Sequence, residues 1–376
     1  MAKLIGDLRP VFVVGIGWHR YQGATATSHV ELGTKAMRDA LSDAGITWSE
    51  IDDIYLGTAR LGMAPGRDIV KHMGALGQSL VHIENASASG SAAFRHGCIS
   101  VAAGMSDAAM ILGVDKLTPL FRQPTGVASL AGDAIQPFTH FALLTNQYVT
   151  RFGILPEDIA RVALKNHNNG AMNPNAHRQQ RRTLDEILQG RRVSGDLTVL
   201  QCCPVGEGAA AVVIASEEGI RRLGIDASRA IRVASSAALS ESVNSSDKGI
   251  SVNGIQRALN DAQIAATDLD VIELHDGFPI EELHYAEASG VCPEGHFVPM
   301  LKEGAFEIGG RCAVSPSGGL LAMGHPVGPT GVGQIGEITM QLRGEAGVRQ
   351  HQGAKLGLAH MVGLGAVCYA HVLVKP

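Results

Sequence analysis

The chain has 376 residues, of which 45% are hydrophobic and 18% are charged, and its formal net charge is −5. This composition predicts a globular protein with two or three domain-sized units and excludes a disordered chain. The acidic balance gives no electrostatic basis for binding nucleic acid or an anionic membrane. The sequence shows no signal-peptide pattern, no apolar run of about 18 residues and no peroxisomal address, so we expect a cytoplasmic protein.

Strand-like and helix-like segments alternate along the chain, which predicts an α/β fold. Short apolar runs predict buried strands at residues 11–15, 54–56, 108–113 and 209–215. Residues 30–44 have the apolar spacing of a helix, and Gly45 is suited to end it. The six cysteines have neither disulfide nor zinc spacing, so we expect reduced thiols.

The chain contains an internal repeat. Residues 40–56 (ALSDAGITWSEIDDIYL) and 258–274 (ALNDAQIAATDLDVIEL) align without a gap and share a helix–turn–strand pattern. This predicts two duplicated α/β halves with a site between them. The segment 119–200 breaks the pattern with clusters rich in Asn, His, Gln and Arg, and we expect an insertion that carries polar surface rather than core.

Ser87 precedes a run of small residues, Ser89-Gly90-Ser91-Ala92-Ala93, which leads into a predicted helix. A nucleophile placed just before a helix N-terminus gains from the helix dipole and from free backbone N–H groups. The simpler interpretation is that Ser87 or Ser89 caps the helix. The local sequence favours the cap.

Three histidines stand at the ends of predicted elements in the second half. His275 follows a strand, His325 lies in a Gly-rich loop, and His360 precedes the sequence MVGLG. Their positions predict one shared polar site. A three-histidine zinc site is the alternative, but the spacing is not that of a metal ligand set, and we expect no metal.

Several strings together resemble the sterol-carrier-protein type of thiolase: HDGFPIEEL (275–283), CPEG (292–295), SPSGGLLAMGHPVGPTG (315–331), QLRGEAG (341–347) and GAKLGLAH (353–360). The resemblance covers the whole chain. It implies a thiolase fold with two duplicated halves in α-β-α-β-α layers, each with a five-stranded mixed sheet. The implied units are an N-terminal half (1–118 and 201–235), an inserted loop domain (119–200) that binds coenzyme A, and a C-terminal half (236–376).

The resemblance also implies an acyl-CoA C-acyltransferase that cleaves a 3-ketoacyl-CoA by thiolysis or runs the reverse Claisen condensation. Residue 87 would carry the acyl group, and His325 would activate it. His275 and His325 would bind one oxyanion, and the backbone N–H groups of Ser87 and Gly363 a second. Coenzyme A would be a substrate rather than a permanent cofactor. Its expected contacts are Arg178, Arg181, Arg182, Ser317 and Gly318. A homodimer and a small OB-fold partner protein are also implied.

The chain departs from the thiolase pattern at three positions. Ser87 stands where the nucleophilic cysteine is expected, and a hydroxyl is a weaker nucleophile than a thiol. Gly277 and Met361 stand where relatives carry acid/base cysteines, and the adjacent His360 is our candidate for that role.

Two accounts of Ser87 remain open. It is either a replacement of a native cysteine or the native residue of a thiolase-like protein with changed chemistry. The alternative functions are a retro-aldolase and a non-catalytic acyl-CoA-binding subunit of a multi-protein complex. The retained Gly-His-Pro and His-Asp-x-Phe sequences count against the known aldolase pattern, and the three histidines count against a binding subunit.

Overall fold

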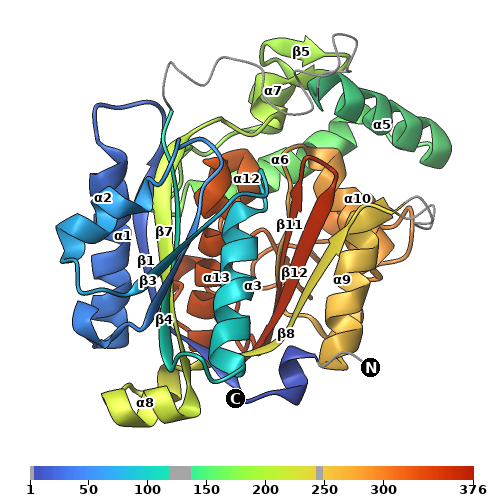
Figure 1. The fold of residues 1–376 in the computed structure, drawn as a ribbon. Helices are drawn as coiled ribbons and strands as arrows, with labels where there is room; N and C mark the ends of the chain where they lie inside the picture. Colours follow the sequence, from blue (N-terminus) through green and yellow to red (C-terminus); the bar gives the residue numbers. More distant parts are fainter. Residues whose placement is uncertain (1–3, 118–136, 243–248) are drawn as a thin grey trace.

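The computed structural model describes residues 4–117, 137–242 and 249–376. The first half, in blue to cyan and yellow-green in Figure 1, is built around five strands. Its elements are β1 (Val11–Gln22), α1 (His29–Ala44), β2 (Asp53–Gly57), α2 (Gly66–Met73), β3 (Ser79–Ile83), α3 (Ser89–Ala102), β4 (Ala108–Asp115), β7 (Glu207–Ser216) and α8 (Glu217–Leu223).

The second half repeats this plan. Its elements are β8 (Ile231–Ser240), α9 (Gly249–Ala262), β9 (Val271–Glu273), α10 (Pro279–Ser289), α11 (Phe297–Lys302), β10 (Ala313–Val314), α12 (Gly319–Ala322), α13 (Val327–Arg343), β11 (Leu356–Gly363) and β12 (Val367–Val374). β8 pairs along its length with β12, so we propose that this half begins at Ile231 rather than at residue 236.

The strands form one ten-stranded sheet in the order β10-β9-β11-β12-β8-β1-β7-β4-β2-β3. From the centre outward, both groups of five have the same order and the same directions: two antiparallel pairings followed by two parallel pairings. The expected duplication into five-stranded mixed sheets is therefore confirmed. In the described part of the chain, strand pairing between the two groups comprises two residue pairs, Phe12–Arg232 and Val13–Ile231.

Helices cover both faces of each five-stranded group. α3 and α13 lie between the two groups, α1 and α2 cover the outer face of the first, and α9 and α10 cover the outer face of the second (Figure 1). This is the expected α-β-α-β-α layering. Because α3 and α13 belong to different halves, their packing brings residues from both halves together.

The local sequence explains the predicted elements. Ser28 begins α1 by accepting a hydrogen bond from the Glu31 N–H, and Gly45 ends the helix in a left-handed conformation (φ 71°). The predicted strands correspond to β1, β2, β4 and β7, and the two copies of the repeat fall on α1–β2 and α9–β9.

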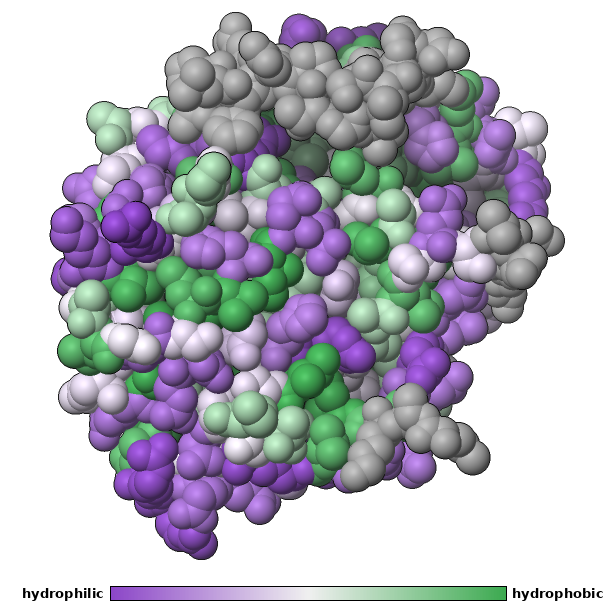
Figure 2. All heavy atoms as spheres, in the orientation of Figure 1, coloured by the Kyte–Doolittle hydropathy of each residue, from purple (hydrophilic) through white to green (hydrophobic). Residues whose placement is uncertain are grey.

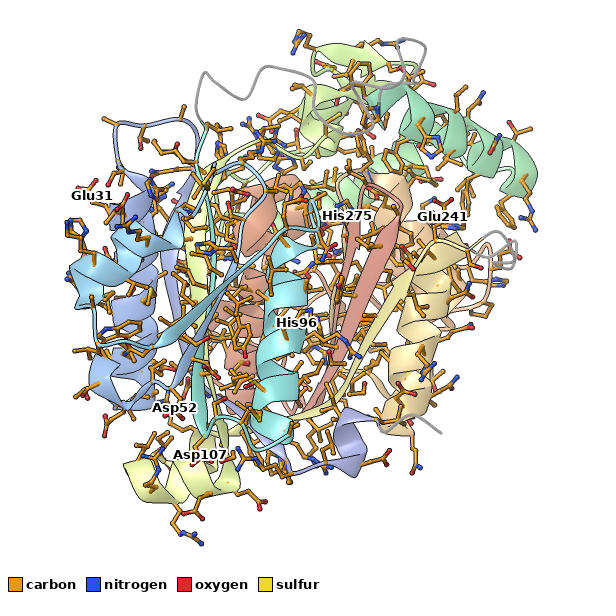
Figure 3. The ribbon with its side chains drawn as sticks, in the orientation of Figure 1. Glu31, Asp52, His96, Asp107, Glu241 and His275 are labelled. Atoms are coloured by element: carbon orange, nitrogen blue, oxygen red, sulfur yellow. The ribbon has the colours of Figure 1, made fainter. Side chains whose placement is uncertain are left out.

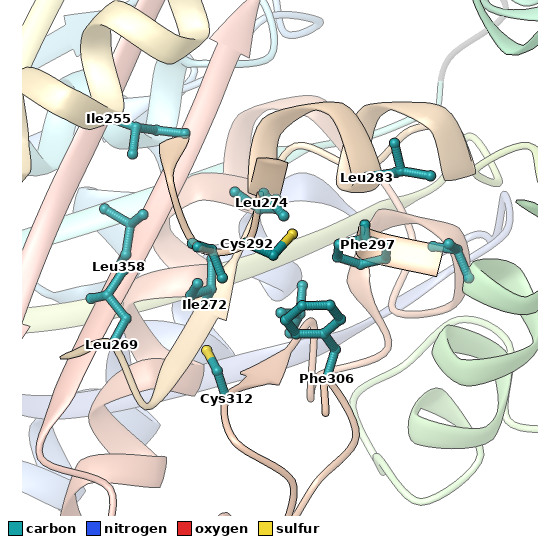
Figure 4. Close-up of a cluster of buried hydrophobic side chains, with 14 of the residues drawn as sticks. Ile255, Leu269, Ile272, Leu274, Leu283, Cys292, Phe297, Phe306, Cys312 and Leu358 are labelled. Carbon is teal, nitrogen blue, oxygen red and sulfur yellow. The ribbon is translucent and has the colours of Figure 1, made fainter. Parts of the chain in front are cut away.

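A large apolar cluster supports the second half (Figure 4). Ile272 and Leu274, at the end of β9, pack in this cluster with Phe297 and Phe306, whose rings stack with centroids 4.4 Å apart. Burial of this apolar surface holds the end of β9 in a defined position. The next residue is His275.

The insertion contributes α5 (Pro137–Phe152), α6 (Pro156–Gly170), α7 (Leu184–Leu188), β5 (Arg192–Ser194) and β6 (Leu197–Thr198). The prediction that its polar clusters form surface was wrong for α6. Lys165, Asn166 and His167 are buried, because their polar atoms have partners in the second half or in the loop near Leu200.

The surface in Figure 2 mixes polar and apolar side chains, with an apolar band over the region of α2 and β3. β3 is an edge strand, and Val81 on it is 38% exposed. Among the described residues, no helix has the length and apolarity needed to cross a membrane.

Candidate active site

Ser87 lies in the turn between β3 and α3. Ala86, the preceding residue, has a positive φ of 49°. A non-glycine residue in this region is strained, and such turns are used to present nucleophiles at the start of a helix. The turn exposes the Ser87 side chain at the N-terminal end of α3.

Ser89, rather than Ser87, closes this turn. The Ser89 Oγ accepts a hydrogen bond from the Asn85 N–H (2.9 Å) and donates one to the Ala86 carbonyl (2.6 Å). The Ser87 Oγ lies 3.0 Å from His325 Nε2. The capping interpretation was wrong for both serines, because the N-cap of α3 is Ala88 and no side chain caps the helix. The Ser87 hydroxyl is instead paired with an imidazole from the other half.

His325 is held on three sides. Its backbone N–H donates to the Pro204 carbonyl (3.2 Å), and its Nδ1 lies 2.9 Å from the Thr330 Oγ1. If Nδ1 carries the ring proton and donates it to Thr330, Nε2 is free to accept the Ser87 proton. Burial, followed by the nearby His275 and Arg60, lowers the pKa of His325 well below its ordinary value. A neutral imidazole at this position can act as a base.

His275 follows β9 after one intervening residue, Leu274, and lies in the upper middle of the molecule in Figure 3. Its ring meets the His325 ring edge-on with a centroid distance of 5.3 Å. Its Nδ1 lies 3.1 Å from the Glu281 Oε1. Ser87, His325 and His275 therefore form one contiguous group, as expected from the sequence.

The structure places His360 inside β11 instead of in a loop. Its Nδ1 accepts a hydrogen bond from the His275 backbone N–H at 3.5 Å, and its ring packs against Tyr285. Burial, with contributions from His275 and His371, lowers the pKa of His360 to about 3. This ring therefore stays neutral at physiological pH, and its contacts favour a role in positioning His275.

Gly363 ends β11 next to the nucleophile turn. A Cβ at this position would lie 2.2 Å from the Asn85 carbonyl oxygen, so only glycine allows the turn and the strand to approach this closely. Its backbone is thus near residue 87, and the second oxyanion site remains a prediction.

The expected coenzyme A contacts divide into two groups. Arg178 donates to the carbonyls of Cys202, Leu321 and Val199, so its guanidinium is occupied within the chain. Ser317 is buried and bonded to Glu273, and Gly318 packs against Gly170. Arg181 is exposed and Arg182 is partly exposed, so these two are better placed to meet phosphates.

A buried polar network, which the sequence patterns did not identify, fixes the His275 segment. The Asp276 carboxylate accepts from the Leu320 N–H (2.7 Å) and from the Asn166 side chain (2.7 Å). Asn166 also donates to Glu282 (2.8 Å), which forms an ion pair with Lys165 (3.0 Å). The HDGFPIEEL string contained the acidic members, but their partners lie in the insertion and could not be identified without the fold.

A cavity of about 520 Å³ opens between α5 and α10 and reaches Glu281 and Tyr285, which are close to His275. Aromatic and aliphatic side chains form much of its wall: Phe141, Leu144, Tyr148, Phe152, Ile280 and Tyr285. Within the described ranges, no group of three or more His, Cys, Asp or Glu residues is arranged to hold a metal ion.

The family model for the thiolase N-terminal domain matches residues 17–218, and the thiolase C-terminal domain-like model matches residues 232–374. The chain therefore belongs to the thiolase family. Within it, sterol carrier protein 2 of Gallus gallus is 33% identical over 384 residues, which cover 95% of this chain and 70% of that protein.

Two further comparisons extend this result. The acetyl-CoA acetyltransferase of Methanothermobacter thermautotrophicus is 30% identical over 387 residues, covering 98% of this chain and 100% of that protein. Among solved structures, the Ltp2-ChsH2(DUF35) aldolase superposes with a TM-score of 0.84, covers 97% of each chain and is 21% identical. At that identity the superposition shows a shared fold.

Proposed function

We propose that the chain is a thiolase-type acyl-CoA C-acyltransferase that forms or cleaves a carbon–carbon bond in a 3-ketoacyl-CoA through an acyl group on residue 87. The observation that carries this proposal is the 3.0 Å approach of the Ser87 Oγ to His325 Nε2 at the start of α3. The neutral imidazole can take the hydroxyl proton as the oxygen attacks the thioester, and the helix N-terminus favours the resulting oxyanion.

The decisive experiment replaces the weak nucleophile. Ser87→Cys should raise thiolysis of a 3-ketoacyl-CoA by at least about 10²-fold, because a thiolate attacks thioesters far better than a neutral hydroxyl. Intact-mass measurement after incubation with acyl-CoA should show one added acyl group in the Ser87→Cys protein. Ser87→Ala is the matched control and should show none. If a panel of acyl chains gave no gain while coenzyme A binding persisted, the proposal would fail.

A retro-aldolase is the second candidate, and Ser87 itself favours it. A retro-aldol cleavage needs a base and an oxyanion site but no covalent nucleophile, so a serine could replace cysteine without loss. The fold shared with the Ltp2-ChsH2(DUF35) aldolase gives this candidate additional support. Release of an aldehyde or ketone from a 3-hydroxyacyl-CoA by the Ser87→Ala protein would establish it in place of acyl transfer.

The partner proteins belong to the same proposal. The exposed edge of β3 and the apolar band over α2 and β3 suit pairing with a second copy of the chain. Val81→Lys should then shift a dimer toward monomer in sedimentation measurements. A small OB-fold partner is proposed from the family resemblance, and the Ltp2-ChsH2(DUF35) aldolase, whose name pairs two components, supports it.

Arg181 and Arg182 are our proposed contacts for the phosphates of coenzyme A. Replacement of both by Gln should raise KM for an acyl-CoA and leave kcat nearly unchanged, because they would bind a part of the substrate that does not react. A fall in kcat as large as the rise in KM would instead indicate that the two substitutions disturb the structure of the insertion.

A further inference from the structure

The chain lacks the acid/base thiols that its relatives use, because Gly277 and Met361 occupy both positions. Claisen and aldol chemistry both need a group that moves a proton at or near the α-carbon. His325 already faces Ser87, and His360 is enclosed in β11 with its Nδ1 turned to the His275 backbone. Proton transfer at the α-carbon therefore needs a side chain other than His325 and His360 in this site.

His275 and Glu281 form a hydrogen-bonded pair with defined roles. The Nδ1–Oε1 distance is 3.1 Å, and the Glu281 side chain is only 3% exposed. The carboxylate is fixed by two further donors, the Phe278 N–H (3.2 Å) and the Tyr285 hydroxyl (3.2 Å). With Nδ1–H directed at the carboxylate, Nε2 is the basic nitrogen. Nδ1 is thus committed to Glu281, and Nε2 is the ring atom left to exchange a proton with a substrate.

Gly277 makes this pair possible. A Cβ at residue 277 would lie 3.0 Å from the Glu281 Oε2 and 3.9 Å from the His275 Cε1. A cysteine at this position would push against the carboxylate that orients His275. The absence of a side chain at residue 277 therefore leaves the space that the buried Glu281 carboxylate occupies beside His275.

We propose that His275 is the catalytic acid/base of this site and that Glu281 is its positioning residue. In the forward direction, His275 Nε2 removes a proton from the α-carbon of an acyl-CoA. The electron pair of the broken C–H bond moves into the thioester to give an enolate, and the imidazolium keeps its Nδ1–H on Glu281. In the reverse direction, the imidazolium returns the proton to carbon. The choice of an acyl-CoA rests on the proposed function.

Other nearby groups are less suited to this role. The Cys203 thiol lies near Gly277, but burial raises its pKa to about 12, so it remains protonated. Asp276 is buried and committed to Leu320 and Asn166. The side chains that contact His275 are Glu281 and His325 at its ring and His360 at its backbone N–H.

Proton exchange tests this proposal without requiring acyl transfer. The whole chain is incubated with acetyl-CoA or propionyl-CoA in D2O, and deuterium at the α-carbon is measured by mass spectrometry. Exchange should occur in the native chain, persist in the exposed-surface variant Glu303→Gln and fall by at least about 10²-fold in His275→Ala. Absence of exchange in the native chain with both thioesters, or full exchange in His275→Ala, would overturn the proposal.

Glu281→Gln should slow exchange by at least about tenfold, because the amide no longer stabilises the imidazolium. The loss should fall on kcat for exchange and leave KM for the thioester nearly unchanged, because the proposed role of Glu281 is to orient the His275 ring. A general disturbance of the structure would raise KM as well as lower kcat. Glu303→Gln, at an exposed position on the protein surface, is the matched control and should behave as the native chain.

Gly277→Ala gives an independent check, because its methyl group presses on Glu281 without removing any titrating group. It should reduce exchange several-fold with native far-UV circular dichroism. An unchanged exchange rate in both Glu281→Gln and Gly277→Ala would overturn the positioning role. If exchange depends on His275 while Ser87→Cys gives no thiolysis, the proposed role of the His275–Glu281 pair is supported and the proposed acyl transfer fails.

Discussion

The first half of the chain contributes Ser87 to the site, whereas the second contributes His275, His325 and His360, although both halves have the same strand order. The junctions that follow β3 and β10 are comparable. Each has a non-glycine residue with positive φ, Ala86 at 49° and Ser315 at 53°.

These two junctions differ in what their hydroxyl groups contact. In the second half, Ser315 donates to Glu282 (2.8 Å) and Ser317 to Glu273 (2.8 Å), and both carboxylates are buried. In the first half, Ser87 faces an imidazole. The comparison shows that two turns with similar backbone conformations place their hydroxyl groups against different partners, and only the partner of Ser87 is an imidazole.

Removal of His325, the imidazole that faces Ser87, should have the largest effect on activity. In the Ser87→Cys background, His325→Ala should lower acyl transfer by at least about 10²-fold, because the first-half junction loses its activating imidazole. Single-turnover acylation followed by mass spectrometry measures this step directly. A loss smaller than about threefold would show that residue 87 is activated by another group.

Breaking the contact between the insertion and the second half should mainly affect stability. Lys165→Met leaves the Glu282 carboxylate buried without its cation and should lower the unfolding free energy by about 3–5 kcal/mol. Lys302→Met, which removes a more exposed ion pair with Asp158, is the control and should cost less than about 1 kcal/mol. Denaturant titration distinguishes the two, and equal costs would contradict the buried role of Lys165.

Separating the central helices should have a moderate effect. A Cβ at Gly331 would lie 2.3 Å from the Ser91 Oγ, so Gly331→Ala should force α13 away from α3 and cost about 1–3 kcal/mol. Acyl transfer in the Ser87→Cys background should fall as well, because the Ser87–His325 distance depends on this packing. Gly62→Ala, which meets no atom within 4 Å, is the control. Unchanged melting temperature in Gly331→Ala would contradict the close packing.

Replacement of Glu273 should change how the stability of the second half depends on pH. Burial and the nearby Glu337 raise the pKa of Glu273 to about 8, despite the opposing hydrogen bonds from Ser317. Between pH 4.5 and 8, the folded chain therefore holds a proton on Glu273 that the unfolded chain has released. As the pH rises through this range, the unfolding free energy should fall by up to about 1.4 kcal/mol per pH unit. Glu273→Gln should flatten this slope in thermal melts from pH 6 to 8. If Glu273→Gln kept the pH dependence of the native chain, that dependence would have to arise from another group.

The elements that could be predicted are those whose sequence signals, such as helix caps and apolar runs, lie within the element itself. Ser28 begins α1 and Gly45 ends it through their own backbone and side-chain geometry. The apolar runs of β1, β4 and β7 are visible in the local sequence, although these strands pair with partners that are distant in the chain. The repeat likewise predicted the duplication because its two copies lie on equivalent elements.

The site was predicted in part. Ser87, His325 and His275 were identified from motifs, and the structure brings them together. The burial of Lys165 and Asn166 was missed because polar residues are buried only when partners from other elements satisfy them. Glu281 was missed for the same reason, since its importance depends on the space at Gly277.

The short junction between β1 and β8 has a mechanical consequence. Within the described residues, the backbone pairing between the two groups of strands is confined to Phe12 and Val13, near the start of β1. Ser87 precedes α3, whose N-terminal end lies at the opposite end of the layers (Figure 1). The two groups of strands therefore diverge from this junction, and α3 and α13 fill the space between them (Figure 1). A small rotation of one group about the junction would produce its largest displacement at the far end of the layers, where Ser87 and His325 face each other.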